Sequence, residues 1–387
     1  MPFVPGRIEF LGKHTDYCGG ESIVCPIDRG FSYDFAVRDD AIVSITSLDS
    51  GEKIAIRLDD SDPHSGPARY VAEVIRRLRA NFGRGLHRGI DLEFRSDLPQ
   101  AAGLSSSSAL MIMIFNALSD ANRLSESEVF QNNVSGELEL AEYLGCIENG
   151  QTFRELTGSA GVGTFGGSQD HAAIVAGRPG ILTRFAFGPL RKRSEVQIPD
   201  EYCFIVASSG VVAEKTGAAL EKYNRASRMV TEVVRAFGNG KTLANLIAEI
   251  GIAELEQTIR SRQFDFPIED MIKRVRQFYE ESFEIIPAVA ELISEWRIET
   301  IGELVDRSQS NAERLLGNQV DETICLQRTA RELGAIAASA FGAGFGGSVY
   351  ALVRKSEAES FTSAWSDVYR ARFPNLRAEF FPAFPDS

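Results

Sequence analysis

The chain of 387 residues has few histidines and cysteines. Its four histidines do not recur at the spacing of a helical metal site, and its five cysteines form no C-x-x-C pair, so we expect no zinc site. Because an odd number of cysteines cannot all pair within one chain, we expect reduced thiols and a cytoplasmic location. The sequence has no stretch of about 18 uncharged apolar residues and no secretory leader, so we expect neither a membrane span nor export.

Positive charge is also scarce. The chain has 41 Lys and Arg residues against 54 Asp and Glu residues, which gives a net charge of -13. Because coating of nucleic acid needs a concentrated face of Lys and Arg, we expect no nucleic-acid partner. The composition is that of a soluble globular protein, and the length favours two hydrophobic cores over one. The pattern makes no prediction of oligomeric state.

Short strands and helices alternate along the chain. Helical periodicity marks 68–82 and 109–118, dominates from about 216 to 340, and returns around 358–370. The polar, basic segment Gly188–Ser194 resembles a solvated linker, which predicts domains 1–190 and 191–387. The order of strands, helices and strands indicates an α+β fold. The expected strands are Arg7–Leu11, Ser32–Val37, Ile42–Thr46, Ile90–Phe94, Leu182–Phe187, Glu201–Ser208, Ser348–Val353 and Glu379–Pro382.

The most informative segment is Pro99–Ala109, in which a glycine and four serines precede an apolar helix. Free backbone N–H groups and the helix dipole favour an anion at a helix N-terminus, so this segment is a candidate phosphate loop. It is not a Walker A loop, because no G-K-[ST] follows. Serine runs also make N-caps and flexible loops, so taken alone the segment leaves both interpretations open.

Glycine turns frame three further segments. Gly342–Gly347 has four glycines in six residues, which permits close backbone approach but also fits a simple turn before a strand. Gly12–Gly20 encloses polar side chains that could hold sugar hydroxyl groups or make a surface turn. Gly166–His171 places Asp170 before a helix, as a catalytic carboxylate or an N-cap.

The order and spacing of these segments resemble the GHMP small-molecule kinases, and the first resembles the galactokinases in particular. Gly6–Gly20 is similar to G-R-x-N-x-I-G-E-H-x-D-Y-x-x-G, Pro99–Ala109 to P-x-x-x-G-L-S-S-S-A, and Gly342–Gly347 to G-x-G-F-G-G. Tyr223–Arg225 resembles the family's Y-N-x-R. The resemblance implies two domains, an N-terminal one like the second domain of ribosomal protein S5 and a ferredoxin-like C-terminal one, with the active site in the cleft between them.

The resemblance also implies an activity, the transfer of phosphate from ATP to the anomeric C1 hydroxyl of a galactose-like sugar. Asp170 would face that hydroxyl with Arg7 as its cationic neighbour, and Ser107 and Glu142 would hold Mg²⁺. Whether Asp170 removes the proton or only orients the hydroxyl stays open. The residues implied to contact the sugar are Lys13, His14, Asp16, Gly167 and Tyr223. The residues implied to bind ATP are Pro99, Gly103, Leu104, Ser105, Ser106, Ser107, Ser108, Gly344 and Gly346.

The sequence departs from the family pattern at three places. Lys13 stands where galactokinases have Glu. Because an ammonium group pairs with a carboxylate, we hypothesise a sugar altered at C6, such as galacturonate, unless Lys13 extends into solvent. Residues 146–165 include an apparent insertion, beginning at Glu148, that could form a lid or a pocket wall, and His171 replaces an expected Gln.

Two alternatives to a sugar kinase remain. A family member could sense sugar and nucleotide without turnover, but Arg7, Ser107 and Asp170 are all retained, which favours catalysis. Another GHMP branch could phosphorylate a different small alcohol, but the His14–Asp16 loop favours a sugar.

Overall fold

The computed structural model describes residues 1–99, 102–212, 217–238 and 240–384. The chain forms two compact units. Strands β1 (Phe3–Leu11) and β2 (Glu21–Arg38) each run from one unit into the other. The first unit comprises Met1–Gly6, Arg29–Leu98 and Ser105–Ala176, and the second comprises Arg7–Asp28, Pro99–Leu104 and the chain from Gly177 onward. The predicted division into 1–190 and 191–387 stays a prediction. Each unit consists of several separate segments, so the two units do not correspond to two continuous stretches of sequence.

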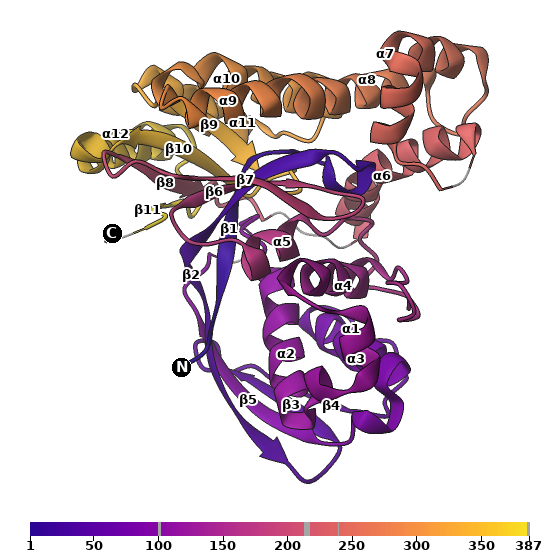
Figure 1. Ribbon diagram of the computed structural model, residues 1–387. Helices are drawn as coiled ribbons and strands as arrows, with labels where there is room; N and C mark the ends of the chain where they lie inside the picture. Colours follow the sequence, from indigo (N-terminus) through magenta and orange to yellow (C-terminus); the bar gives the residue numbers. More distant parts are fainter. Residues whose placement is uncertain (100–101, 213–216, 239, 385–387) are drawn as a thin grey trace. The chain divides into compact units, whose positions relative to one another are not determined.

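The first unit packs helices on a sheet. The second half of β2 pairs antiparallel with β5 (Gly89–Ser96), which lies parallel to β3 (Ile42–Ser47), and β3 pairs with β4 (Lys53–Arg57). Figure 1 shows the helices gathered on one side of these strands. They are α1 (Pro67–Phe82), α2 (Ser106–Asn122), α3 (Glu128–Asn133), α4 (Glu137–Asn149) and α5 (Gln169–Ala176), with 3-10 turns η2 (Gly83–Gly85) and η3 (Leu124–Glu126).

The predicted helices of this unit are confirmed for the reasons that the patterns suggested. In α1 the apolar residues Val71, Val74 and Leu78 are buried, as the periodicity predicts, and the charged residues Glu73 and Arg77 are buried with them. Helix α2 is apolar on nearly every side, so it lies in the interior between its neighbours, with Met111, Ile114 and seven other apolar side chains buried. This central helix begins directly after the serine run.

The second unit contains an antiparallel sheet in the order β11-β8-β10-β9. Its strands are β8 (Tyr202–Ser208), β9 (Ala337–Phe341), β10 (Ser348–Arg354) and β11 (Glu379–Pro382). In chain order this is fourth, first, third, second, with helices between the first and second strands and between the third and fourth. That split βαβ arrangement is the expected ferredoxin-like one. The helix α12 (Ala358–Arg372) covers it with Trp365 and Tyr369 fully buried.

The remaining elements of the second unit form a helical group and a short antiparallel extension of β2. The helices are α6 (Gly217–Phe237), α7 (Leu243–Ser261), α8 (Ile268–Tyr279), α9 (Ile286–Ser294), α10 (Gly302–Asn311) and α11 (Asp321–Glu332). Single turns are η1 (Asp16–Cys18), η4 (Glu280–Ile285), η5 (Ile298–Thr300), η6 (Ala312–Leu316) and η7 (Lys355–Glu357). The strands β6 (Ile181–Ala186) and β7 (Arg191–Gln197) extend β2.

Two local predictions are wrong. The expected linker within Gly188–Ser194 is instead a turn into β7, an exposed edge strand whose charged residues Arg191–Arg193 suit an unpaired edge. The helical pattern expected to reach residue 340 ends at Glu332, because Ala337–Phe341 forms the fully buried strand β9. Alanine favours helix intrinsically, and strand pairing with β10 overrides that preference.

Within the described ranges, no helix has both the length and the apolar character needed to cross a membrane.

Candidate active site

The loop after β1 is held in the second unit by its own hydrogen bonds. Gly12 has a φ of 113°, and Thr15 donates its hydroxyl to the Gly12 carbonyl at 2.8 Å and to the Glu21 carbonyl at 2.7 Å. The Asp16 side chain accepts from the backbone of Tyr17 at 2.9 Å and is only partly buried. The loop therefore presents the Asp16 carboxylate from a rigid turn.

A buried arginine on α8, Arg274, holds the same loop through hydrogen bonds. Arg274 is 1% exposed and donates through Nη2 to the His14 carbonyl at 2.6 Å and to the Tyr17 hydroxyl at 3.1 Å. Gln277, on the next turn of α8, donates to the Lys13 carbonyl at 3.1 Å. Sequence reasoning missed Arg274, whose signal would have been a charge on the apolar stripe of α8.

These contacts define the tautomer of His14. Its Nε2 lies 3.3 Å from the Ala343 carbonyl and its Nδ1 lies 2.9 Å from the Tyr17 hydroxyl. A carbonyl can only accept, so Nε2 carries the hydrogen and Nδ1 of the neutral ring accepts from Tyr17. A chain of hydrogen bonds thus runs from Arg274 through Tyr17 and His14 to Ala343 in the glycine-rich loop, Gly342–Gly347.

Burial keeps the neighbours of His14 protonated. Burial raises the pKa of Tyr17 well above its ordinary value, although the Arg274 charge opposes the shift. For the same reason the pKa of the Cys18 thiol rises to about 12. At neutral pH the Tyr17 hydroxyl therefore keeps the hydrogen that it donates to His14.

Lys13 is 1% exposed, so the alternative in which it extends into solvent is wrong. Its Nζ donates to Ser339 at 2.8 Å and to Ser308 at 3.1 Å. Ser308 donates in turn to Glu281 at 3.0 Å, and the same carboxylate oxygen accepts from the Gly12 backbone at 2.8 Å. The ammonium charge is therefore offset through a serine by a fully buried carboxylate.

Two of the predicted nucleotide loops meet within the second unit. Gly342 has a φ of 81°, and a Cβ atom there would lie 2.9 Å from the Gly103 carbonyl oxygen, so only glycine allows this approach. Arg7, which is 3% exposed, donates through Nη1 to the same carbonyl at 2.6 Å. Ala102 and Gly103 are therefore packed against Gly342 and Gly347, which lie more than 200 positions further along the chain.

The glycine-rich loop, Gly342–Gly347, also packs against Asn318, which follows η6. Gly344 has a φ of 82°, and a Cβ atom there would lie 2.3 Å from the Asn318 carbonyl oxygen. Gly346 has a φ of 132°, and a Cβ atom there would lie 2.8 Å from the Val211 carbonyl oxygen, so both positions require glycine. Nucleotide binding by Gly344 and Gly346 stays a prediction.

The serine run lies at the N-terminus of α2 in the first unit. Ser105 has a left-handed φ of 62° and is 6% exposed, and its hydroxyl has no hydrogen-bond partner among the described residues. Ser106 and Ser107, in the first helical turn, are partly exposed. A buried hydroxyl without a partner beside free helical N–H groups suits an oxygen-rich anion.

A buried carboxylate supports this helix start. Ser108 donates its hydroxyl to Glu148 Oε2 at 2.7 Å, and His171 Nε2 lies 3.3 Å from the same oxygen. All three side chains are less than a tenth exposed. The fourth serine, the replacement at 171 and the first residue of the apparent insertion therefore form one cluster.

The family resemblance implies Glu142 on α4 as a Mg²⁺ ligand and does not name Glu148. Residues six apart on a helix differ by about 120° in direction, so only one of them can face α2. Ala141, Leu144 and Glu148 follow the spacing of the buried face, whereas Glu142 is partly exposed. A charge at an apolar position was the signal that could have identified Glu148.

Asp170 lies in the first turn of α5, where the helix dipole favours a negative charge. The glycine turn before it is anchored by Asn149, which donates to the Gly166 carbonyl at 3.0 Å. Asp170, Gly167, Glu142 and the four serines belong to the first unit.

The other predicted site residues belong to the second unit. Tyr223, on α6, lies with its ring centroid 5.5 Å from that of His14. The structure therefore brings His14 and Tyr223 together, and joins Arg7 to the predicted phosphate loop.

Comparison with known proteins finds family matches in three parts of the chain. Residues 69–178 match the GHMP kinases N terminal domain, residues 285–371 match the GHMP kinases C terminal family, and residues 2–32 match the galactokinase galactose-binding signature. The chain therefore belongs to the GHMP kinases.

Within that family the chain is galactokinase-like. The galactokinase of Limosilactobacillus reuteri (strain DSM 20016) is 25% identical over 395 residues, which cover 98% of this chain and 92% of the relative. The galactokinase of Roseiflexus sp. (strain RS-1) is 28% identical over 368 residues, covering 94% and 86%. The crystal structure of Lactococcus lactis galactokinase complexed with galactose has the same fold, with a TM-score of 0.77 at 24% identity and coverage of 98% and 92%.

The predictions of the family, of the two-domain fold and of the enzyme class, an ATP-dependent sugar kinase, are confirmed.

Proposed function

We propose that this kinase transfers the γ-phosphoryl group of ATP to the anomeric C1 hydroxyl of a galactose-like monosaccharide. The observation that carries the proposal is the packing of Gly342 against Gly103, with Arg7 bonded to the same loop. Full-length relatives named galactokinase support the choice of sugar.

In this proposal Asp170 accepts or orients the hydrogen of the attacking hydroxyl. The sugar oxygen forms a bond to the γ-phosphorus, the bond from that phosphorus to the β,γ-bridging oxygen breaks, and ADP leaves. The guanidinium of Arg7 offsets the negative charge that develops during transfer.

A divalent cation is part of the proposal, since Mg²⁺ neutralises nucleotide phosphates and prefers oxygen ligands. The side chains at the start of α2 fit that preference, with a partly exposed Ser107 hydroxyl and the Glu148 carboxylate against Ser108. No cluster of three or more His, Cys, Asp or Glu side chains suited to a metal occurs among the described residues, so the remaining ligands would come from nucleotide and water. We therefore propose Ser107 and Glu148, in preference to Glu142, as the protein ligands.

For the sugar, we propose that Asp16 is the main acceptor of hydroxyl hydrogens, with Tyr223 and Gly167 contributing contacts. Both ring nitrogens of His14 already bond to the protein, so its contribution is mainly the shape of the loop. A cytoplasmic location stays a prediction.

Release of ADP on mixing ATP with candidate sugars tests the proposal. We expect turnover with a galactose-like sugar and a loss of at least about a hundredfold in kcat for Asp170→Asn. Binding of sugar and ATP without ADP release would instead identify a sensor. Near-normal turnover of the variant would show that another carboxylate acts.

A further inference from the structure

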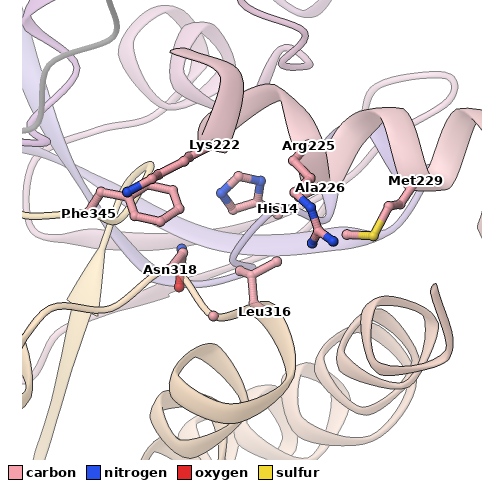
Figure 2. A pocket seen from close by; sticks show the side chains of 9 residues that line it. His14, Lys222, Arg225, Ala226, Met229, Leu316, Asn318 and Phe345 are labelled. Atoms are coloured by element: carbon pink, nitrogen blue, oxygen red, sulfur yellow. The ribbon is translucent and has the colours of Figure 1, made fainter. Parts of the chain in front are cut away.

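A pocket of about 240 Å³ lies beside His14, entirely within the second unit. Figure 2 shows the Lys222 and Arg225 side chains of α6 directed into the same space as the His14 ring, with Phe345 and Asn318 on the other walls. Lys222, Arg225 and Met229 follow one face of α6, at intervals of three and four residues. The pocket is therefore formed by elements that are already fixed by the sugar loop and the glycine-rich loop.

The pocket is positively charged in a protein whose net charge is -13. Among the described residues that line it, none is acidic. Lys222 is exposed, its ammonium lies 5.9 Å from the centre of the Phe345 ring, and it has no carboxylate partner in the described part of the chain. The cation is therefore available to a ligand.

Arg225 retains donors for a ligand as well. Its Nη2 donates to Asp270 at 2.7 Å in an ion pair that is about two-fifths exposed. An exposed ion pair of this kind is weak, and a guanidinium has five N–H donors. Lys222 and Arg225 are the Lys and Arg side chains that line the pocket, so they supply its positive charge.

The position of the pocket connects it with the acceptor. His14, which lines the pocket, also lies against Tyr223, which directly follows Lys222 on α6 and is a proposed sugar contact. Lys13, which the sequence suggests as a carboxylate partner, is not among the lining residues and is bonded to Ser308 and Ser339. A charge on the sugar would therefore meet Lys222 and Arg225 instead.

We propose that the acceptor is an anionic monosaccharide, whose carboxylate or phosphate group is bound in this pocket by Lys222 and Arg225. This inference rests on the proposed sugar kinase function and specifies its substrate class. A charged hydrogen bond of this kind gives a sugar acid a large advantage over the neutral sugar, because an empty cationic pocket gains nothing from a hydroxymethyl group.

Steady-state kinetics with galactose, galacturonate and galactose 6-phosphate test the inference. We expect a kcat/KM at least about tenfold higher for one of the two anionic sugars than for galactose, and which one it is distinguishes carboxylate from phosphate. In Lys222→Gln, the KM for that sugar rises about tenfold or more, whereas kcat, the KM for galactose and the KM for ATP change less than about twofold. Arg225→Gln shows the same pattern.

The matched control is Arg235→Gln, which removes one exposed cation from the same helix outside the pocket. It should leave all three KM values unchanged. Equal kcat/KM for galactose and both anionic sugars would overturn the inference and leave the sugar kinase proposal intact. A rise in the KM for ATP alone in Lys222→Gln would assign the pocket to the nucleotide and overturn it too.

Calorimetric binding separates the two proposals if no sugar is phosphorylated. In that case the kinase proposal fails, but the pocket is still tested. At least about tenfold weaker binding of galacturonate or galactose 6-phosphate by Lys222→Gln would support the anion site, and unchanged binding of both would overturn it.

Discussion

The buried charge of Lys13 is held by polar side chains from distant parts of the chain. Lys13 donates hydrogen bonds to Ser308 and Ser339, and Ser308 donates one to the fully buried Glu281. A buried cation is tolerated only where polar partners replace water, and these residues supply them. We interpret Lys13 as part of the support of the sugar loop.

Lys13→Met tests this interpretation. We expect the free energy of unfolding to fall by about 2–4 kcal/mol, because the variant leaves buried serine and carboxylate oxygens without their cation. Urea unfolding measures the change. Lys273→Met, at an exposed position on α8, is the control and should change stability by less than about 0.5 kcal/mol. A Lys13→Met protein as stable as the wild type would contradict the interpretation.

The buried thiols predict a loss of stability in alkali. Burial raises the pKa of both Cys18 and Cys25 from about 9 to about 12. Because the unfolded chain releases these protons first, their contribution is complete below pH 9 and is lost as the pH rises toward 12.

Cys25→Ala removes one of these groups. Between pH 9 and 11 the free energy of unfolding of the variant should decrease less steeply than that of the wild type, by up to about 1.4 kcal/mol per pH unit. Urea unfolding at several pH values measures the slope, whatever the stability at neutral pH. Parallel slopes would show that the Cys25 thiol ionises alike in both states.

Individual site residues differ in how far the sequence could identify them. The roles of Arg7 and Asp170 came from a motif and remain proposals, whereas burial of Lys13 and the tautomer of His14 depend on partners such as Ser308 and Ala343, which lie about 300 residues away. No local pattern specifies such contacts. Glu148, in contrast, could have been found from its place on the apolar face of α4.

Two of the carboxylates on helix α4 have different surroundings. Glu148 faces Ser108 at the start of α2, whereas Glu142 is partly exposed. Through Glu148, α4 contacts both Ser108 of the predicted phosphate loop and His171 of α5.

Isosteric variants of these two residues test the proposed metal ligand. For Glu148→Gln we expect the Mg²⁺ concentration that gives half-maximal activity to rise about tenfold or more, and the Mg²⁺ dependence of ATP binding to shift likewise, because an amide is a poorer ligand than a carboxylate. Glu142→Gln should behave as the wild type. The reverse result would restore Glu142 as the ligand.

Among the secondary-structure elements, those with strong local patterns were predictable. Helices α1 and α2 and strands β8 and β10 lie where periodicity places them. Strand β9 was not predictable, because its alanines prefer a helix and only pairing with β10 makes them a strand. The edge strand β7 has too few apolar residues to show a strand pattern.

For the molecule as a whole, the sequence predicted the fold through resemblance more than through pattern. Composition and periodicity indicated only an α+β protein with two cores. The motifs in their family order predicted the GHMP fold, which the family matches and the ferredoxin-like sheet confirm. The sequence could not predict that each unit contains separate segments of the chain. That arrangement arises because β1 and β2 each have one part in the first unit and one part in the second.

Phosphorus NMR of an acceptor screen with ATP and Mg²⁺ is the decisive experiment for the proposal that this kinase phosphorylates a sugar at C1. We expect ADP to appear together with one new phosphomonoester, whose phosphorus couples to the anomeric proton of a galactose-like sugar. A product phosphorylated at another carbon, or complete recovery of ATP with every sugar offered, would contradict it.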